Sequence, residues 1–287
     1  MQPVAFLGLG VMGYPMAGHL AKKGYDVTVY NRTIEKAENW AKKYKGAVAV
    51  NPWNAVKGAD VIFLCLGDDP DVEFIVDDVY GEVKKGAVIV DHTTASPSLA
   101  KKLHKVLADG DIGFVDAPVS GGQAGAENGK LSVMCGGDEP HVAAVRPAME
   151  SYSARIVHVG PSGHGQLCKA VNQICIAGVL QGLSEGVHFA TRAGLDIDRV
   201  LEAISGGAAQ SWQMENRAKT MSADEFDFGF AVDWMRKDLR IALSEARNNG
   251  ARLPLTALVD QFYADVQAMD GGRWDTSSLI RRLTDID

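Results

Sequence analysis

The sequence predicts an α/β fold in which a doubly wound parallel sheet is followed by an all-helical C-terminal part. As far as Gly160, short apolar runs alternate with segments of helical periodicity, and no strand pattern follows Gly186. Strands that alternate with helices in this way form a parallel sheet with helices on both faces. The longest apolar-periodic segment, residues 165–192, predicts a long helix that links the two parts. We therefore expect two domains, residues 1–162 and 163–287.

The composition is that of an ordinary globular protein without a nucleic-acid or membrane partner. The 287 residues carry a net charge of -7, and no basic cluster offsets this acidic balance. Met1-Gln2-Pro3 lacks the basic start of a signal peptide. No apolar run approaches the roughly 20 residues that span a bilayer. The four cysteines show no ligand-like spacing, so we expect no metal, reduced thiols and a cytoplasmic location.

The first strand is expected at residues 4–7, and the glycine-rich segment Gly8-Leu9-Gly10-Val11-Met12-Gly13 follows it at once. A helical pattern then leads to a second strand at residues 26–30, which completes a βαβ unit. In such a unit Gly8 permits the tight turn, Gly10 lets the backbone approach a pyrophosphate, and Gly13 lets the helix pack on the strand. The helix N-terminus adds unpaired N–H groups and a positive dipole end. We therefore predict that residues 8–13 bind a dinucleotide.

The residues after the second strand indicate which dinucleotide binds. NAD-binding folds usually have Asp or Glu here, which bonds the ribose 2′-hydroxyl, whereas this chain has Asn31-Arg32-Thr33. Arg32 can pair with a 2′-phosphate, and Asn31 and Thr33 can donate hydrogen bonds to it. NADP is therefore the expected cofactor and NAD the alternative. If no 2′-phosphate binds, Arg32 is simply a loop cation.

The alternation of strands and helices continues beyond this unit. We expect strands at residues 61–66, 87–91, 113–118, 131–137 and 155–160, and helices at residues 53–57, 72–79, 98–107 and 140–149. Leu66 and Gly67 end one of these strands, at the sheet edge where parallel sheets bind ligands, and we include them in the cofactor site. The C-terminal part is expected to form helices at residues 196–205, 211–220, 232–249 and 254–269.

Two further stretches carry polar groups suited to chemistry. Ser120-Gly121-Gly122 lies in a segment, residues 119–129, that we expect to be a loop. Its successive backbone N–H groups suit a carboxylate, although a merely flexible loop is the alternative. Lys169 and Asn172 are three apart in the predicted long helix and share one face. An ammonium and a carboxamide side by side can protonate and orient one substrate oxygen, and a solvated face is the alternative.

The glycine segment joins three other motifs in a family resemblance. These are Asp91-His92-Thr93-Thr94, the run from Asp116 to Gly122 that reads Asp-Ala-Pro-Val-Ser-Gly-Gly, and the stretch from Gly165 to Gln173. Their order and spacing resemble the β-hydroxyacid dehydrogenase family, which includes 3-hydroxyisobutyrate dehydrogenase, tartronate semialdehyde reductase and plant-type glyoxylate/succinic semialdehyde reductases. The resemblance covers essentially the whole chain. It implies a Rossmann domain, a long linking helix and a helical domain of the 6-phosphogluconate dehydrogenase type that helps to form the interface of a homodimer or homotetramer.

The resemblance also implies roles for individual residues. Lys169 would be the catalytic acid/base and Asn172 its neighbour at the reacting oxygen. Ser120, Gly121 and Gly122 would bind the substrate carboxylate, and Thr94 would contact the nicotinamide ribose or the substrate. Near the C-terminus, Lys237 would lie beside the cofactor, while Phe230 and Asp238 would line the site. Trp212 and Trp234, with Phe262 and Tyr263, are expected in the core or at an interface, and the two tryptophans are alternative walls of a substrate pocket.

The implied activity is reversible hydride transfer between a nicotinamide and a small aldehyde or keto acid. Because Asn31-Arg32 favours NADPH and NADPH pools usually drive reduction, we expect reduction to be the physiological direction. Alternatives are NAD(P)-dependent oxidation of 3-hydroxyisobutyrate or L-serine, imine reduction, and a non-catalytic NADP-binding module. Imine reductases share the fold but lack a lysine at the position of Lys169. This chain departs from the family's usual pattern at Thr93, where Ser is usual, and at His92, where a small or apolar residue is common. We expect His92 to be a surface-loop histidine, with a role in substrate choice as the alternative.

Overall fold

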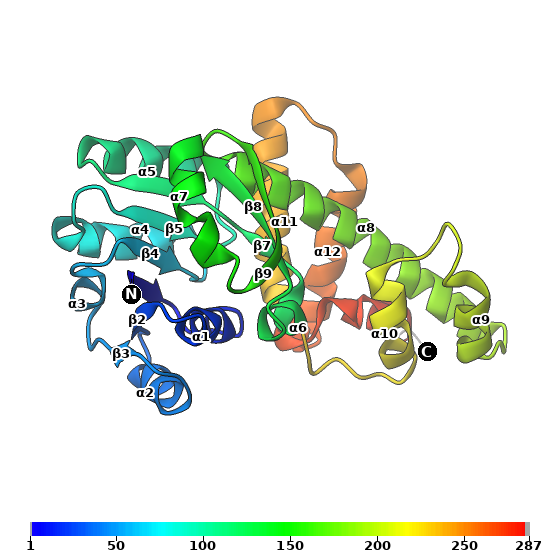
Figure 1. Ribbon diagram of the computed structural model, residues 1–287. Coiled ribbons are helices and arrows are strands. Elements are labelled where there is room, and N and C mark those ends of the chain that lie inside the picture. Colours follow the sequence, from blue (N-terminus) through cyan, green and yellow to red (C-terminus); the bar gives the residue numbers. More distant parts are fainter. Residues whose placement is uncertain (1, 285–287) are drawn as a thin grey trace. The chain divides into compact units, whose positions relative to one another are not determined.

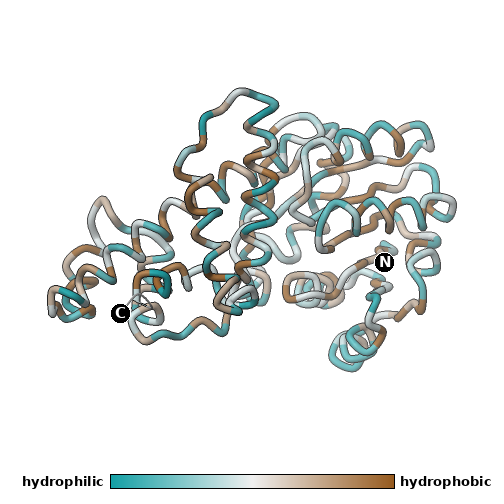
Figure 2. Tube along the Cα trace, turned by 180° about the vertical axis from the view of Figure 1, so that it is seen from behind, coloured by the Kyte–Doolittle hydropathy of each residue, from teal (hydrophilic) through white to brown (hydrophobic). Residues whose placement is uncertain are grey.

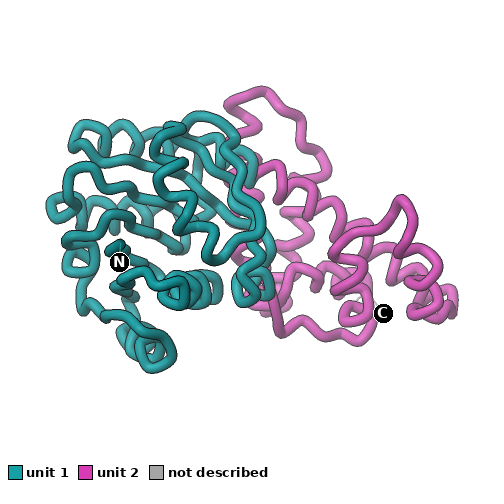
Figure 3. Tube along the Cα trace, viewed as in Figure 1, with its two compact units in different colours: residues 1–169 teal, residues 170–287 magenta. Residues whose placement is uncertain are grey.

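The computed structural model of the protein describes residues 2–284. The chain divides into two compact units, unit 1 from Met1 to Lys169 and unit 2 from Ala170 to Asp287 (Figure 3). The division falls within helix α8 (His164–Arg192), whereas the expected domain boundary, between residues 162 and 163, lies just before that helix.

Unit 1 is built on one sheet, which confirms the predicted parallel, doubly wound class. Its parallel part runs in the order β3 (Ala47–Val48), β2 (Asp26–Tyr30), β1 (Pro3–Leu7), β4 (Val61–Leu64), β5 (Val88–Asp91) and β6 (Gly113–Asp116). The sheet continues with β8 (Leu131–Gly137) antiparallel to β6, β7 (Val119–Ser120) antiparallel to β8, and β9 (Ser153–Gly160) parallel to β8 (Figure 1). The strand order reverses between β1 and β4, where this fold class places ligands at the carboxyl ends of the strands.

Helices cover both faces of this sheet, which is why its central strands are buried throughout. Every residue of β4, β5 and β6 is buried. Neighbouring residues of one strand face opposite layers, so Phe6 packs in one apolar cluster and Leu7 in the other. The first layer contains α1 (Gly13–Lys22), α2 (Ile34–Lys43), α6 (Gly122–Glu127) and α7 (Glu139–Met149), and the second contains α3 (Pro52–Val56), α4 (Asp69–Val79) and α5 (Pro97–Asp109). Figure 2 shows hydrophobic residues along the strands and mainly hydrophilic ones along α2.

One segment of unit 1 differs from the prediction. Residues 119–129 were expected to form a loop, and instead they form strand β7 and helix α6. Gly121 and Gly122 have φ values of +128° and +59°, a backbone conformation that glycine adopts at low cost, so the chain turns directly from β7 into α6. Ala126 then packs in the first layer. The glycines therefore act as a sharp turn between two elements.

Unit 2 is helical, as predicted. Besides its part of α8, it contains α9 (Ile197–Ile204), α10 (Trp212–Ser222), α11 (Val232–Asn249), α12 (Pro254–Ala268), α13 (Arg281–Thr284), and two 3-10 helices, η2 (Gly271–Arg273) and η3 (Thr276–Ile280). Its main core joins α8, α11 and α12 around the fully buried Tyr263. Trp212 and Trp234 lie outside this core because both are substantially exposed in the single chain. Within residues 2–284, none of the helices combines the length and the apolar character that crossing a bilayer requires.

Candidate active site

The glycine-rich segment joins β1 to α1 with a geometry that fits a dinucleotide. A side chain at Gly8, where φ is +101°, would place its Cβ 2.2 Å from the Cys65 carbonyl oxygen, and at Gly13 the Cβ would lie 2.0 Å from the Gly8 oxygen. Both positions therefore require glycine for packing. A Cβ at Gly10, in contrast, would meet no atom within 4 Å. The backbone at Gly10 thus faces open space beside the N-terminus of α1, whose first turn carries no acidic residue to compete with a phosphate.

Of the three residues after β2, Asn31 is hydrogen-bonded to the backbone, whereas Arg32 and Thr33 are exposed. The Asn31 Oδ1 accepts a hydrogen bond of 2.8 Å from the Leu9 N–H, and its Nδ2 donates to the Thr33 carbonyl at 2.9 Å. Asn31 therefore holds the glycine segment against β2, a role that the sequence alone did not indicate. Arg32 is almost fully exposed, and its guanidinium lies 3.8 Å from the Asp71 carboxylate. Because exposed pairs at this distance are weak, Arg32 can turn to an anionic ligand.

The ends of β4 and β5 are tied together by Thr93. The Thr93 Oγ1 accepts from the Leu66 N–H at 2.9 Å, and its own N–H donates to the Asp91 carboxylate at 2.9 Å. From α8, the Gln166 side chain donates to the Thr93 carbonyl at 2.7 Å and accepts from the Ala95 N–H at 3.1 Å. This network fixes the backbone on both sides of the half-buried Thr94. Gln166 was not among the predicted site residues.

His92 is buried, so the expectation of a surface-loop histidine is wrong. Its N–H continues the sheet by donating to the Leu64 carbonyl at 2.8 Å, which directs the side chain into the packed layer. There the Nδ1 lies 2.6 Å from the Ala117 carbonyl oxygen and the Nε2 lies 2.8 Å from the Tyr152 hydroxyl. Burial lowers the pKa of His92 to about 4. Sequence reasoning missed this because the partners lie 25 and 60 residues away.

Lys169 lies beside the Ser120-Gly121-Gly122 turn. It is buried, and its Nζ donates a hydrogen bond of 2.9 Å to the Val119 carbonyl. The positive φ values of Gly121 and Gly122 turn the backbone there, and both glycines are exposed. Consecutive glycine amides in such a turn form a concave site for an anion. The predicted acid/base is therefore hydrogen-bonded to the residue that immediately precedes the predicted carboxylate-binding turn.

The start of α8 is anchored by Asp116, at the end of β6. Its carboxylate accepts from the Gly163 N–H at 2.7 Å and from the Gln166 N–H at 3.0 Å, which satisfies donors at the start of the helix. Burial raises the pKa of Asp116, and these two backbone bonds oppose that rise. A Cβ on Gly165 would lie 2.4 Å from the Met134 carbonyl oxygen, so α8 packs closely on the sheet only with glycine there. Asp116 and Gly165 thus help to fix where the start of α8, and with it Lys169, lies relative to the sheet.

Unit 2 contains a separate chain of polar contacts. The Asn172 Nδ2 donates to the Gln173 Oε1 at 2.7 Å, and the Gln173 Nε2 donates to the Asp238 Oδ2 at 2.7 Å. The Lys237 Nζ lies 3.2 Å from the Asp238 Oδ1. The half-buried Phe230 is held through its N–H, which donates to the Asp275 carboxylate at 3.0 Å. The predicted residues Asn172, Lys237 and Asp238 are therefore connected, and the connecting residue Gln173 was not predicted.

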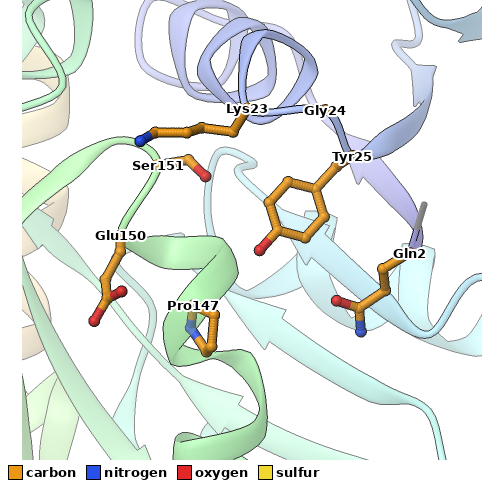
Figure 4. A pocket seen from close by; sticks show the side chains of 7 residues that line it. All are labelled: Gln2, Lys23, Gly24, Tyr25, Pro147, Glu150 and Ser151. Carbon is orange, nitrogen blue, oxygen red and sulfur yellow. The ribbon is translucent and has the colours of Figure 1, made fainter.

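A hollow lies elsewhere on unit 1, between the turn before β2 and the turn after α7 (Figure 4). Tyr25, Lys23 and Glu150 are among its lining residues. Burial, and then the negative charge of Glu150, raise the pKa of Tyr25. Because Gln2 and Tyr25 precede β1 and β2, this hollow lies at the amino end of the sheet. Parallel sheets of this class bind ligands at the opposite end, and we assign the hollow no function.

The comparisons with known proteins identify the family. A family model for the NAD binding domain of 6-phosphogluconate dehydrogenase matches residues 3–160. A second model, described as the NAD-binding of NADP-dependent 3-hydroxyisobutyrate dehydrogenase, matches residues 163–283. An uncharacterized oxidoreductase of Shewanella frigidimarina (strain NCIMB 400) is 59% identical over 99% of this chain and 98% of its own. The 2-hydroxy-3-oxopropionate reductase of Escherichia coli (strain K12) is 37% identical over 98% of this chain and 96% of its own.

A solved structure agrees with these relatives. Mycobacterium tuberculosis 3-hydroxyisobutyrate dehydrogenase, solved with L-serine, superimposes with a TM-score of 0.90 at 30% identity and covers 99% of both chains. The chain belongs to the β-hydroxyacid dehydrogenase family, which confirms the resemblance found in its motifs. It is an NAD(P)-dependent oxidoreductase of the 3-hydroxyisobutyrate dehydrogenase and tartronate semialdehyde reductase type, and its cofactor is a nicotinamide dinucleotide.

Proposed function

We propose that the protein is an NADPH-preferring reductase that converts a small aldehyde or keto acid to its hydroxy acid, with Lys169 as the acid/base. The observation that carries the proposal is the position of the buried Lys169 ammonium, which donates to Val119 immediately before Ser120-Gly121-Gly122. A substrate whose carboxylate binds at that turn has its neighbouring carbonyl group within reach of a proton donor. These are the two contacts that reduction of a small oxoacid requires.

Each part of the proposed site has one task. The bound nicotinamide cofactor supplies the hydride. Residues 8–13 bind the pyrophosphate, with Leu66, Gly67, Thr94 and Lys237 as further proposed cofactor contacts. Lys169 donates a proton to the carbonyl oxygen during reduction and accepts it during oxidation, while Asn172 orients that oxygen. Phe230 and Asp238 are proposed substrate contacts with Ser120, Gly121, Gly122 and Thr94.

The preference for NADP rests on the residues after β2. Arg32 is exposed and only weakly paired, so a 2′-phosphate can recruit its guanidinium at little cost. Thr33 begins α2 without a capping bond from its side chain, which makes its hydroxyl a second proposed contact. Asn31 retains only part of its hydrogen-bonding capacity for the ribose, because both its oxygen and its nitrogen already have partners. Arg32 is therefore the proposed main determinant.

The relatives indicate the substrate class. The Escherichia coli relative is named a reductase of 2-hydroxy-3-oxopropionate, which is tartronate semialdehyde, and this favours a small aldehyde acid. The Mycobacterium tuberculosis structure is named 3-hydroxyisobutyrate dehydrogenase and was solved with L-serine, which supports oxidation of such hydroxy acids as the second candidate. The presence of Lys169 separates both from imine reduction.

The test follows the nicotinamide absorbance. NADPH and NADH are each offered with glyoxylate, succinic semialdehyde and tartronate semialdehyde, and NADP and NAD with 3-hydroxyisobutyrate and L-serine. We expect the fastest turnover with NADPH and an aldehyde acid, and a kcat that is lower by about a hundredfold or more, but still measurable, in Lys169→Ala. Full activity of that variant would remove Lys169 from the mechanism. Turnover only of the hydroxy acids with NAD would establish the second candidate, and tight NADPH binding without any turnover would favour a non-catalytic module.

We further propose that the protein is a homodimer or homotetramer in a reducing compartment such as the cytoplasm. Helix α8 exposes three large apolar side chains in unit 2, Val171, Val179 and Phe189, and association with a second copy would cover them. All four cysteines are free, which suits a reducing compartment. Light scattering during gel filtration should give two or four times the chain mass. A monomer would contradict the first proposal, and a disulfide in the protein isolated from its cells would contradict the second.

A further inference from the structure

The backbone from Ala117 to Val119, which leads from β6 into β7, is held at three successive carbonyl groups, each by a different part of unit 1. The Ala117 oxygen lies 2.6 Å from the Nδ1 of His92. The Pro118 oxygen accepts from the Met134 N–H at 3.0 Å, and the Val119 oxygen accepts from the Lys169 Nζ at 2.9 Å. Because the Val119 oxygen accepts a hydrogen bond from the ammonium, the position of this backbone segment helps to determine where the lysine head lies.

The protonation state of His92 follows from its two partners. A carbonyl oxygen can only accept, so the Nδ1 carries a hydrogen and donates it to Ala117. Since burial keeps the ring neutral, with a pKa of about 4, the Nε2 has a free lone pair and accepts from the Tyr152 hydroxyl at 2.8 Å. The imidazole is therefore bound at both edges and has one defined tautomer.

The ring of His92 is also packed on its faces. It stacks on Phe63 with 5.7 Å between centroids and an interplanar angle of 4°. Tyr152 meets it edge-on at 5.5 Å and 89°. His92 and Tyr152 are both fully enclosed by the sheet and its covering layer, so the imidazole has no room to rotate away from Ala117. Such a locked donor can hold a carbonyl in one position.

We propose that His92 is a positioning residue for Lys169. With Tyr152 it holds the Ala117 carbonyl, and the fixed φ of Pro118 passes that constraint to the Val119 carbonyl that directs the ammonium. The inference rests on the proposed role of Lys169 as acid/base. Because His92 lies in the packed layer behind this backbone segment, it acts on the reaction only through the segment.

A double-mutant cycle separates positioning from simple core packing. We measure kcat at saturating NADPH for the wild type, His92→Leu, Lys169→Ala and the double variant, with whichever of glyoxylate, succinic semialdehyde or tartronate semialdehyde the wild type reduces fastest. We expect His92→Leu to lower kcat about tenfold when Lys169 is present, by analogy with displaced catalytic groups. We expect no further loss in the Lys169→Ala background and an unchanged KM for NADPH. Equal losses in both backgrounds would overturn the proposal.

His92→Asn is the matched control, because the amide nitrogen of Asn can occupy the place of the Nδ1 and still donate to Ala117. It should recover kcat to within about threefold of the wild type, whereas a variant as slow as His92→Leu would show that the donor is irrelevant and overturn the proposal. If His92→Leu does not fold, His92→Gln replaces it in the cycle, since its longer side chain carries no donor at the δ position.

A second readout needs no turnover. In the cofactor-free protein, acetylation of Lys169 by acetic anhydride is followed by peptide mass spectrometry. A lysine released from Val119 should react at least threefold faster in His92→Leu and at the wild-type rate in His92→Asn. Equal rates in all three proteins would overturn the positioning role even if Lys169 proves essential. Wild-type kcat in Lys169→Ala would instead overturn the proposed function, on which the inference rests.

Discussion

Gln173 donates a hydrogen bond of 2.7 Å from its Nε2 to the Oδ2 of Asp238, and this contact fixes which way the amide points. A carboxylate can only accept, so the amide oxygen of Gln173 must face the other way, where it accepts from Asn172 at 2.7 Å. Lys237 balances the buried carboxylate from 3.2 Å. The orientation of Asn172, a proposed catalytic residue, therefore depends on a negative charge on α11.

Replacing Asp238 by Asn should destabilise the protein strongly. The substitution keeps the side-chain volume but removes the charge that pairs with the nearly buried Lys237, and breaking such a pair costs on the order of 3 kcal/mol of unfolding free energy. Urea unfolding followed by circular dichroism gives the measurement. Glu202→Gln is the control, because its partner Arg199 and Glu202 itself are both largely exposed. Equal effects of the two substitutions would contradict the role of the network.

Two alanine substitutions in the glycine segment should have opposite consequences. Gly13→Ala places a Cβ 2.0 Å from the Gly8 oxygen, so we expect a loss of about 1–3 kcal/mol of unfolding free energy, as for other overpacked sites. Gly10→Ala meets no atom within 4 Å, and we expect an unchanged unfolding midpoint without cofactor.

The same pair is then compared by titration with NADPH. A methyl group at Gly10 would occupy the space through which a pyrophosphate approaches. We therefore expect the Kd of Gly10→Ala for NADPH to rise at least tenfold, which corresponds to a loss of about 1.4 kcal/mol of binding free energy. Unchanged NADPH affinity in a stable Gly10→Ala protein would show that the dinucleotide does not lie against this segment.

Arg32→Glu should change the cofactor preference without changing stability. The Arg32 side chain is 91% exposed, so the fold should tolerate the change within about 0.5 kcal/mol. A lost charge-assisted contact of about 1.5–3 kcal/mol, followed by repulsion of the 2′-phosphate, should lower the ratio of kcat/KM for NADPH over NADH by about a hundredfold. The exposed Lys57→Glu makes the same charge change elsewhere on unit 1. If both variants alter the ratio equally, Arg32 does not contact the cofactor.

The features that the sequence predicted are those encoded by near neighbours. The buried run at β4 is recognisable because apolar residues follow one another, although the strand ends at Leu64, two residues before the predicted end. The glycine segment and α8 are likewise recognisable from residues that lie close together in the sequence. His92 was misplaced because its environment is made by Ala117 and Tyr152, which only the folded sheet brings together. Gln173 was missed because an amide becomes a positioning group only beside a specific partner, here Asp238.

The depressed pKa of His92 should make stability depend on pH in a defined window. In the folded protein this pKa is about 4, against an ordinary value of 6.5 for histidine, so between these values the unfolded chain binds more protons than the folded one. The free energy of unfolding should therefore fall as the pH falls from 6.5 to 4. The difference corresponds to about 3 kcal/mol in total.

The groups that face His92 do not titrate in this window. Burial raises the pKa of Tyr152 well above its ordinary value of 10, and Phe63 and the Ala117 carbonyl carry no titratable proton. Asp116, whose pKa burial raises, acts in the opposite sense, since its protonation stabilises the folded state as the pH falls. The measurement must therefore be a difference between two proteins that share Asp116.

Urea unfolding of the wild type and His92→Asn at intervals from pH 7 to about pH 3 isolates the histidine. Because Asn does not titrate, the difference in unfolding free energy should change by about 3 kcal/mol across the window and level off below pH 4. The wild type should lose unfolding free energy relative to His92→Asn at the acid end, where its buried imidazole must take up a proton. Two curves that stay parallel over the whole range would show that His92 titrates alike in the folded and unfolded chains, which a ring enclosed by Phe63 and Tyr152 cannot do.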